Sequence, residues 1–177
     1  MKRITILILL GFFAFNIQAQ KSEIKKIRKQ YYSVSEQIKN KSLYINEIVI
    51  NKNGKEKDNW PAVGNYYNKM TFYYDTPPAH WDGEAKKSLI KIVSEQVYAA
   101  RNLRYEYLFK NGKLIFCYIK QKDLSEHRYY FSKGKLIKYL EKLESDLAEF
   151  NKEYYKDILD NAKRLQKLYI SISNEEY

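Results

Sequence analysis

The sequence between residues 105 and 137 contains the same hairpin pattern twice, and this repeat restricts the fold more than any other feature. Tyr-Glu-Tyr-Leu-Phe, Lys-Asn-Gly and Lys-Leu-Ile at 105–115 correspond to His-Arg-Tyr-Tyr-Phe, Ser-Lys-Gly and Lys-Leu-Ile at 127–137, 22 positions later. Asn111-Gly112 between two strand-like runs indicates a type I′ turn, because both central residues of that turn need φ > 0. Lys133-Gly134 is a poorer match, since only the glycine suits that geometry. The repeat predicts four consecutive antiparallel strands.

A two-residue turn also predicts which residues face each other across the first hairpin. The expected pairs on one face are Phe109 with Leu114, Tyr107 with Phe116, and Tyr105 with Tyr118. The other face would carry the remaining apolar residues, namely Leu108, Ile115, Cys117 and Ile119. Both faces are too apolar to be left in water, so we expect helices over one face and a loop or a partner over the other.

Two residues of the first hairpin are chemically notable. Glu106 falls on the Leu108 face, and a buried carboxylate there needs a cationic partner, for which Arg101, Arg104 and Arg128 are the candidates. A structural ion pair, or an edge residue that reaches water, is favoured over a catalytic acid. Cys117 is the single cysteine, so it has no partner for an internal disulfide or a zinc site and is expected to be a small buried hydrophobic residue.

Three further stretches read as strands. The first runs from Leu43 to Asn51, and the second runs from Tyr66 to Asp75 with its apolar residues alternating between two faces. The stretch from Glu84 to Asn102 fits either a helix or a strand, because a short apolar run does not distinguish them. We favour a long bent strand from about Ser88, since the Tyr105 run pairs forward. The sheet would then have about six strands.

Two amphipathic helices flank the predicted strands. Residues 22–40 carry one apolar stripe at steps of three and four, formed by Ile24, Ile27, Tyr31, Val34 and Ile38. This stripe is narrow, so the helix should lie on a sheet. A long C-terminal helix is predicted over about 141–170. Its stripe consists of Leu143, Leu147, Phe150, Tyr154, Ile158, Ala162, Leu165 and Tyr169.

The N-terminus is that of an exported protein. Lys2-Arg3 precedes an apolar run from Ile4 to Phe15, and Ala19 then supplies the small residue expected before a cleavage site. We therefore predict a signal peptide over residues 1–19, cleavage after Ala19, and a single α+β domain over residues 20–177. The apolar run is short for a membrane span, so no transmembrane helix is expected after cleavage; an uncleaved anchor is the alternative. The predicted location is periplasmic or secreted.

The element order predicts an α+β fold: an N-terminal helix, a curled antiparallel β-meander with tandem hairpins, and a long C-terminal helix. A long helix cradled by a bent antiparallel sheet resembles the cystatin-like and NTF2-like architectures. The chain also resembles small, functionally uncharacterised secreted proteins of Gram-negative bacteria. That resemblance rests on the exported N-terminus, the Ile-Arg-Lys-x-Tyr pattern at 27–31 and the Glu-Tyr-Leu-Phe-x-x-Gly-Lys-Leu-Ile run at 106–115. It implies no assigned chemistry.

The candidate ligand site is a stiff loop at residues 76–83. Pro77 and Pro78 fix its backbone, and it holds a histidine, a tryptophan and an acid within three positions. The candidate ligand-binding residues are Trp81, His80 and Asp82 of this loop, together with Trp60, Tyr107 and Tyr129. Glu126 and His127 are adjacent on a strand and point to opposite faces, so they make a poor catalytic pair. No catalytic residue, metal site or cofactor is assigned.

Charge and tyrosine content shape the functional hypotheses. The chain has a net charge of +11 and 18 tyrosines, which favours acidic partners such as an acidic glycan or an envelope protein. The lysines are scattered, so nucleic acid is not expected. The first hypothesis is a non-enzymatic binding module that uses a Tyr-rich sheet face and the 76–83 loop. The alternatives are a small NTF2-like hydrolase or isomerase with a pocket between sheet and N-terminal helix, and a structural envelope protein that forms homo-oligomers through its C-terminal helix.

Overall fold

The computed structural model describes residues 2–50, 66–76, 88–98, 101–143 and 150–175, and within them the side chains of residues 18–50, 67–76, 88–97, 102–143 and 150–173. Within these ranges the elements are α1 (Lys2–Lys39), β1 (Tyr44–Ile50), β2 (Tyr66–Tyr74), β3 (Leu89–Tyr98), β4 (Arg101–Lys110), β5 (Lys113–Gln121), β6 (Ser125–Ser132), β7 (Lys135–Leu143), η2 (Lys152–Tyr154) and α3 (Tyr155–Glu175). The strands form one antiparallel sheet in sequence order. The predicted α+β meander between two helices is confirmed.

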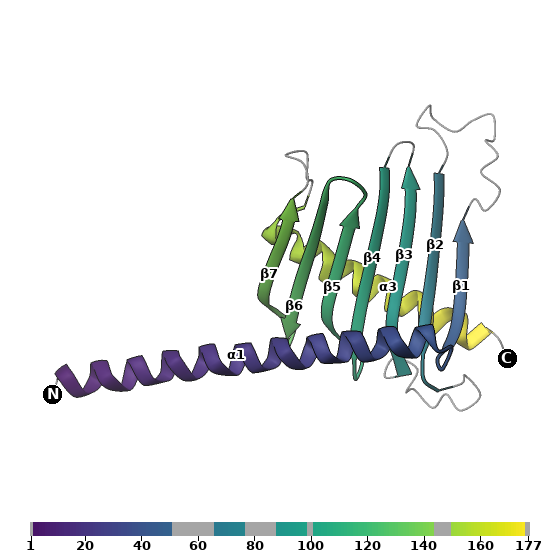
Figure 1. Cartoon of the computed structure of the whole chain (residues 1–177). Helices are drawn as coiled ribbons and strands as arrows, with labels where there is room; N and C mark the ends of the chain where they lie inside the picture. The colour runs from purple at the N-terminus through teal and green to yellow at the C-terminus, as the bar shows by residue number, and fades with distance from the viewer. Residues whose placement is uncertain (1, 51–65, 77–87, 99–100, 144–149, 176–177) are drawn as a thin grey trace.

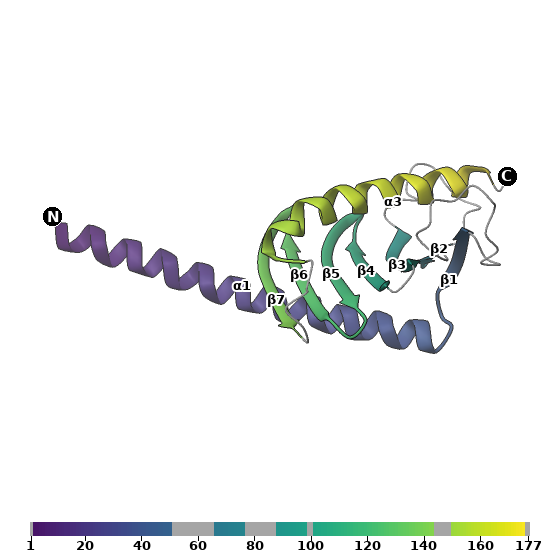
Figure 2. The ribbon, with the colours of Figure 1, turned by 90° about the horizontal axis from the view of Figure 1, so that it is seen from above.

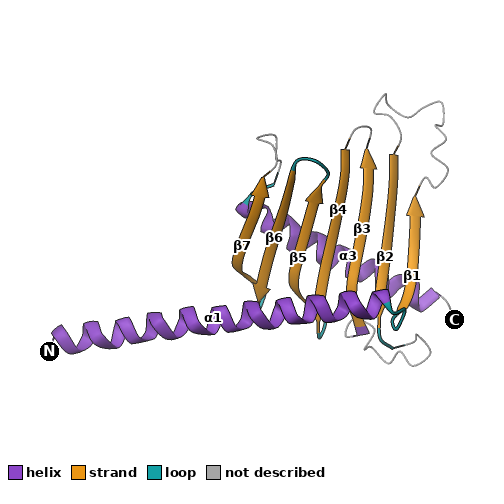
Figure 3. Ribbon diagram, in the orientation of Figure 1, coloured by secondary structure: helices purple, strands orange, loops and turns teal. Residues whose placement is uncertain are grey.

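The two helices lie on opposite faces of the sheet. Figure 1 shows α1 in front of the strands and α3 behind them, and the turned view in Figure 2 separates the three layers. The secondary-structure colouring of Figure 3 shows that both helices cross the strands instead of running along them. The expectation that a loop or a partner would cover one face is therefore wrong, because α1 lies on one face of the described sheet and α3 on the other.

The sheet has seven strands where the sequence predicted about six. The difference comes from the stretch after Ser88, which is strand as predicted but is not one long bent strand. β3 and β4 pair antiparallel from Lys91–Leu108 to Tyr98–Arg101, so the chain reverses after Tyr98. The sequence between Tyr98 and Arg101 has no glycine, proline or asparagine to signal a turn.

Both tandem hairpins are closed by the same kind of turn. Asn111 and Gly112 have φ values of 49° and 69°, and Lys133 and Gly134 have values of 50° and 74°. All four residues are therefore left-handed, as a type I′ turn requires. Lys133 adopts this conformation although a lysine side chain disfavours it, because the strands on either side fix the chain reversal.

Each hairpin also contains a β-bulge that the sequence did not predict. Phe109 pairs with Leu114 as expected, but Leu108 pairs with Phe116, so Ile115 has no partner in the ladder. The predicted pairs of Tyr107 with Phe116 and of Tyr105 with Tyr118 are therefore wrong; Tyr107 pairs with Cys117 and Tyr105 with Ile119. Cys117 and Ile119 consequently lie on the Tyr107 face, away from Leu108.

Three bulges share one consequence. The ladder skips Ile90 between β2 and β3, Ile115 between β4 and β5, and Ile137 between β6 and β7. All three isoleucines are partly buried in the cluster beneath α1. Because a bulge adds one residue to a strand, it lets an extra apolar side chain turn toward this face. The bulges thus build the apolar surface on which α1 lies.

The C-terminal helix begins later than predicted. Residues 141–143 end strand β7, and Phe150 and Asn151 precede η2, so a helix that starts at residue 141 is wrong. The Asn151 side chain accepts a hydrogen bond from the backbone N–H of Glu153 at 2.9 Å, which caps the helical segment. Leu143 is exposed and Leu147 lies outside the described residues. The later part of the predicted stripe is correct: Ile158, Ala162, Leu165 and Tyr169 are all buried.

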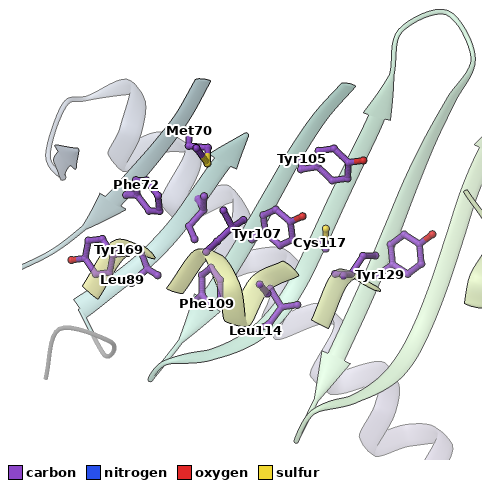
Figure 4. Packing of buried hydrophobic residues seen from close by; sticks show 14 of the residues in the cluster. Met70, Phe72, Leu89, Tyr105, Tyr107, Phe109, Leu114, Cys117, Tyr129 and Tyr169 are labelled. Carbon is purple, nitrogen blue, oxygen red and sulfur yellow. The ribbon is translucent and has the colours of Figure 1, made fainter. Parts of the chain in front are cut away.

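Helix α3 covers a continuous aromatic core. This cluster extends from Ile48 of β1 to Tyr139 of β7 and includes both Tyr107 and Tyr129 (Figure 4). Phe72 stacks on Tyr169 of α3 with ring centroids 5.8 Å apart. The Tyr-rich sheet face proposed for ligand binding is thus the face that α3 covers.

Helix α1 packs through a narrower stripe. Ile27 and Val34 are buried, and Ile24, Tyr31 and Ile38 pack beside them, which confirms the predicted stripe. The N-terminal part of α1 extends beyond the sheet in Figures 1 and 2. In the described part of the chain, no helix has the length and apolarity to cross a membrane. The predicted cleavage after Ala19 falls within α1 and stays a prediction.

Candidate functional site

A cleft lies between α1 and strands β5–β7. It has a volume of about 530 Å³ and is lined on its apolar side by Ile27, Leu140 and five aromatic residues. The aromatic residues are Tyr31, Tyr32, Phe116, Tyr118 and Tyr130. Its charged lining residues are Arg28, Arg128 and Glu126. Volumes of this size suit a small organic ligand.

The backbone geometry explains why these residues converge. Phe116 and Tyr118 are two residues apart on β5, as are Arg128 and Tyr130 on β6, so each pair points to the same face. On α1, the buried Ile27 fixes the helix against the sheet. The residues that follow it, including Arg28 and Tyr31, therefore face the space beside the contact line.

Each arginine lies over a tyrosine ring. The guanidinium carbon of Arg28 is 5.6 Å from the centroid of Tyr130, and its Nε donates to the Tyr130 hydroxyl at 3.2 Å. Arg128 lies 5.6 Å above Tyr118, and its Nη2 donates to Glu126 at 2.8 Å. A guanidinium has five N–H donors, so these contacts leave donors on both arginines for a ligand. Stacking on a ring also holds the cation in place.

A buried charge cluster holds Tyr31, one of the residues that line the cleft. Glu106 accepts from the Tyr31 hydroxyl at 2.7 Å, forms an ion pair with Lys91 at 2.5 Å, and accepts from Arg104 Nε at 2.7 Å. The Lys91 ammonium also lies 4.6 Å from the centroid of the Tyr31 ring. Lys91 and Glu106 are 4% and 6% exposed, so both charges are removed from water and depend on each other.

The ionisation of this cluster follows from its contacts. Burial alone would raise the pKa of Glu106, but the Lys91 charge and the three donors outweigh it and hold that pKa below its ordinary value. Burial and the neighbouring carboxylate raise the pKa of Tyr31. Glu106 is therefore an anion fixed in place at neutral pH. The expected structural ion pair is confirmed with Arg104, whereas Arg128 pairs with Glu126 and the main partner, Lys91, was not predicted.

A second polar cluster lies on the α3 face. Nε2 of His127 is 2.7 Å from Ser125 Oγ, and its Nδ1 is 2.9 Å from the Tyr139 hydroxyl, which donates to Glu141 at 2.7 Å. Because the Tyr139 proton is used on Glu141, Nδ1 of His127 is the donor and Nε2 accepts from Ser125. His127 is fully buried and its ring packs against Phe150. This chain of hydrogen bonds is part of the core, and burial lowers the pKa of His127.

The structure describes two of the six sequence-predicted site residues, Tyr107 and Tyr129. Trp60, His80, Trp81 and Asp82 lie outside the described residues. Tyr107 and Tyr129 are 3% and 0% exposed beneath α3, so a ligand cannot reach their rings. Cys117 is a fully buried free thiol, as predicted, and burial raises its pKa. Glu126 and His127 lie on opposite faces, also as predicted.

The residues that line the cleft were missed because their pattern is spread over three distant segments. The usable signal is a pair of aromatic or arginine residues two positions apart on β5 and on β6, and an arginine beside an apolar stripe residue on α1. Such signals are common in sheets and helices. Only the placement of α1 across β6 brings Arg28 to Tyr130.

The chemistry of the cleft is not identified by a metal centre or by a related protein. Among the described residues, no group of three His, Cys, Asp or Glu side chains is arranged to hold a metal ion. Comparison with protein-family models, curated proteins and solved structures finds no match for this chain. The function is therefore inferred from the geometry of the cleft.

Proposed function

We propose that the protein is an exported, non-enzymatic binding module whose ligand carries an acidic group and occupies the cleft between α1 and β5–β7. The observation that carries this proposal is the pair of arginines stacked on tyrosines, Arg28 on Tyr130 and Arg128 on Tyr118, in one cleft. Guanidinium groups bind carboxylates through paired, charge-assisted hydrogen bonds. Export is proposed from the signal-peptide pattern of residues 1–19.

The lining of the cleft favours binding over catalysis. Its location matches the pocket of the alternative hypothesis, a small NTF2-like hydrolase or isomerase. Among the described lining residues the carboxylate is Glu126, which is paired with Arg128 and Lys120, and none is a histidine. Glu106, which accepts from Tyr31 of the lining, is held as an anion by three donors. General acid–base catalysis needs a group that changes protonation near the working pH, and the lowered pKa of Glu106 does not suit that role.

The third hypothesis, self-association through the C-terminal helix, has less support. The apolar stripe of α3 packs on the sheet of its own chain, with Ile158 and Tyr169 fully buried. A homo-oligomer would therefore need a different surface.

We propose the acidic ligand to be a glycan, since tyrosine rings pack against the apolar faces of sugar rings while arginines pair with their acidic groups.

A calorimetric titration tests the proposal. The probes are digalacturonic acid, which carries two carboxylates, and lactose as a neutral disaccharide. We expect binding of the acidic probe only. Arg28→Gln and Arg128→Gln should each weaken binding about tenfold or more, which corresponds to one lost charge-assisted hydrogen bond. Lys25→Gln, an exposed change on α1 outside the cleft, is the matched control and should bind like the parent protein.

Two results would contradict the proposal. One is the absence of selective binding, seen as equal affinity for the acidic and neutral probes or as no heat from either. The other is unchanged affinity in both arginine variants while their thermal unfolding also matches the parent protein, because the cleft would then play no part in binding.

A further inference from the structure

The face of the sheet that carries α1 continues beyond the cleft as a row of charges. This row crosses six strands at one register position and consists of Lys69, Glu95, Arg104, Lys120, Glu126 and Lys142. Glu126 belongs to the cleft, and its carboxylate is 3.7 Å from Lys120. The row therefore passes the cleft at Glu126 and continues from there across β5, β4, β3 and β2.

A shallower depression lies farther along this row, away from the cleft. It has a volume of about 290 Å³ and is formed by β2–β5, with Tyr67, Asn102 and Lys122 among its lining residues. Arg104 and Lys120 of the charged row also line it. The cleft and the depression thus share one boundary, the contact between Lys120 and Glu126.

The combined surface is basic. The charged residues that line the cleft and the depression are Arg28, Arg104, Lys120, Lys122, Arg128, Glu95 and Glu126, five cations against two carboxylates. Arg104, Lys120 and Arg128 retain 42%, 50% and 40% side-chain exposure, so a ligand can reach them. A surface of this charge favours an anionic partner with several acidic groups.

The dimensions indicate a chain-like ligand. Neighbouring strands are about 4.8 Å apart, so the distance from β6 in the cleft to β3 in the depression is roughly 14 Å. A single sugar ring in the cleft cannot span that distance. We propose, on the basis of the function proposed above, that the ligand is an acidic oligosaccharide that runs from the cleft over Lys120 into the depression beside Tyr67.

The site is built on a sheet face, which favours a glycan over an acidic peptide. Extended peptides gain affinity by adding a strand to a sheet edge, where backbone N–H and C=O groups are unpaired. On the central strands β3–β6 the backbone groups are used in the ladders with both neighbours. What this face presents instead is side chains: tyrosine rings, arginines and lysines at regular intervals.

The test is a length series. Galacturonate oligomers of two, four and six rings are titrated into the full mature chain by calorimetry. We expect the hexamer to bind at least tenfold more tightly than the dimer, because only the longer chains reach the depression. The double variant Tyr67→Ala/Lys122→Gln changes two side chains that line the depression and not the cleft, so it should lose that gain and leave dimer affinity unchanged. Arg28→Gln should weaken binding of every oligomer by a similar factor.

A control and the opposing outcomes complete the design. Lys167→Gln removes one exposed charge on α3, across the sheet, and should leave the length dependence intact. Equal affinity for dimer and hexamer, with no effect of the Tyr67/Lys122 variant, would overturn the extended site and leave the cleft proposal standing. Absence of binding at every length would overturn both. Tighter binding of hexaglutamate than of the hexasaccharide would replace the glycan by an acidic peptide.

Discussion

The two faces of the sheet are covered by helices in different ways. The α3 face is closed by a single cluster that reaches from β1 to β7 and is rich in aromatic rings. The α1 face has a smaller cluster centred on Ile27, Val34 and the strand residues beneath them. Beyond this cluster the α1 face carries ion pairs, including Lys91–Glu106 and Arg128–Glu126.

This difference separates stability from recognition within one sheet. Apolar burial on the α3 face contributes more stabilisation than burial on the α1 face, because more apolar side chains are buried there. The α1 face buries fewer apolar side chains and carries exposed cations and a cleft. Because packing on the α3 face stabilises the fold, the α1 face can remain partly open for a ligand.

The largest expected effect is on the closed face. Phe72→Ala removes a fully buried ring that stacks on Tyr169, and it should lower the free energy of unfolding by about 3–5 kcal/mol. Urea unfolding followed by circular dichroism measures this change. Tyr32→Ala, at a side chain that is 68% exposed, is the control and should change stability by less than about 0.5 kcal/mol. Similar losses in both variants would remove the contrast between core and cleft.

A smaller effect is expected beneath α1. Lys91→Met removes the main cationic partner of Glu106 but leaves Arg104 and the Tyr31 hydroxyl in place. We expect a loss of about 1–3 kcal/mol, less than for a fully uncompensated buried charge. Lys69→Met, which breaks the exposed pair with Glu47, should cost under about 1 kcal/mol in the same assay. If the two lysine variants were equally stable, the buried cluster would have no special role.

The smallest effect is a pH dependence that belongs to the same cluster. The pKa of Glu106 is lower in the folded chain than its ordinary value of 4.5. As the pH falls, this carboxyl therefore takes up a proton in the unfolded chain before it does so in the folded chain. The stabilisation by Glu106 is complete above the ordinary pKa and is lost as the pH falls through the folded pKa. The decline in unfolding free energy below about pH 5 should be shallower in Glu106→Gln than in the parent protein.

Urea unfolding at pH 3 to pH 6 measures this slope. Glu36→Gln, on the exposed side of α1, is the matched control and should keep the parent pH dependence. A Glu106→Gln variant with an unchanged slope would show that other carboxylates govern the acid sensitivity, and that the buried cluster is not ionised as its contacts indicate.

The sequence predicted the features that depend on local periodicity. The repeated turn signals at Asn111-Gly112 and Lys133-Gly134 located both hairpins, and helical spacing identified the stripes of α1 and α3. Alternation also placed Glu126 and His127 on opposite faces. These features need only neighbouring residues, so a single sequence contains the information.

What the sequence did not predict depends on contacts between distant segments. A bulge at Ile115 leaves no local mark, because Leu-Ile-Phe reads equally well with or without the extra residue. Lys91 was overlooked as the partner of Glu106, since their proximity follows from the β3–β4 register. The cleft needs α1 to cross β6, and no stretch of sequence encodes that crossing.

The position of α1 also restricts the order in which the chain can fold. Tyr31 finds its partner Glu106 75 residues later, Arg28 finds Tyr130 102 residues later, and Gln20 finds Ile137 117 residues later. The strands, in contrast, pair only with their immediate neighbours and can form hairpin by hairpin. Helix α1 therefore cannot complete its contacts until the second hairpin has formed, although it precedes every strand in the sequence. Until then its apolar stripe is not fully covered, so the N-terminal segment stays accessible to other proteins while the sheet forms.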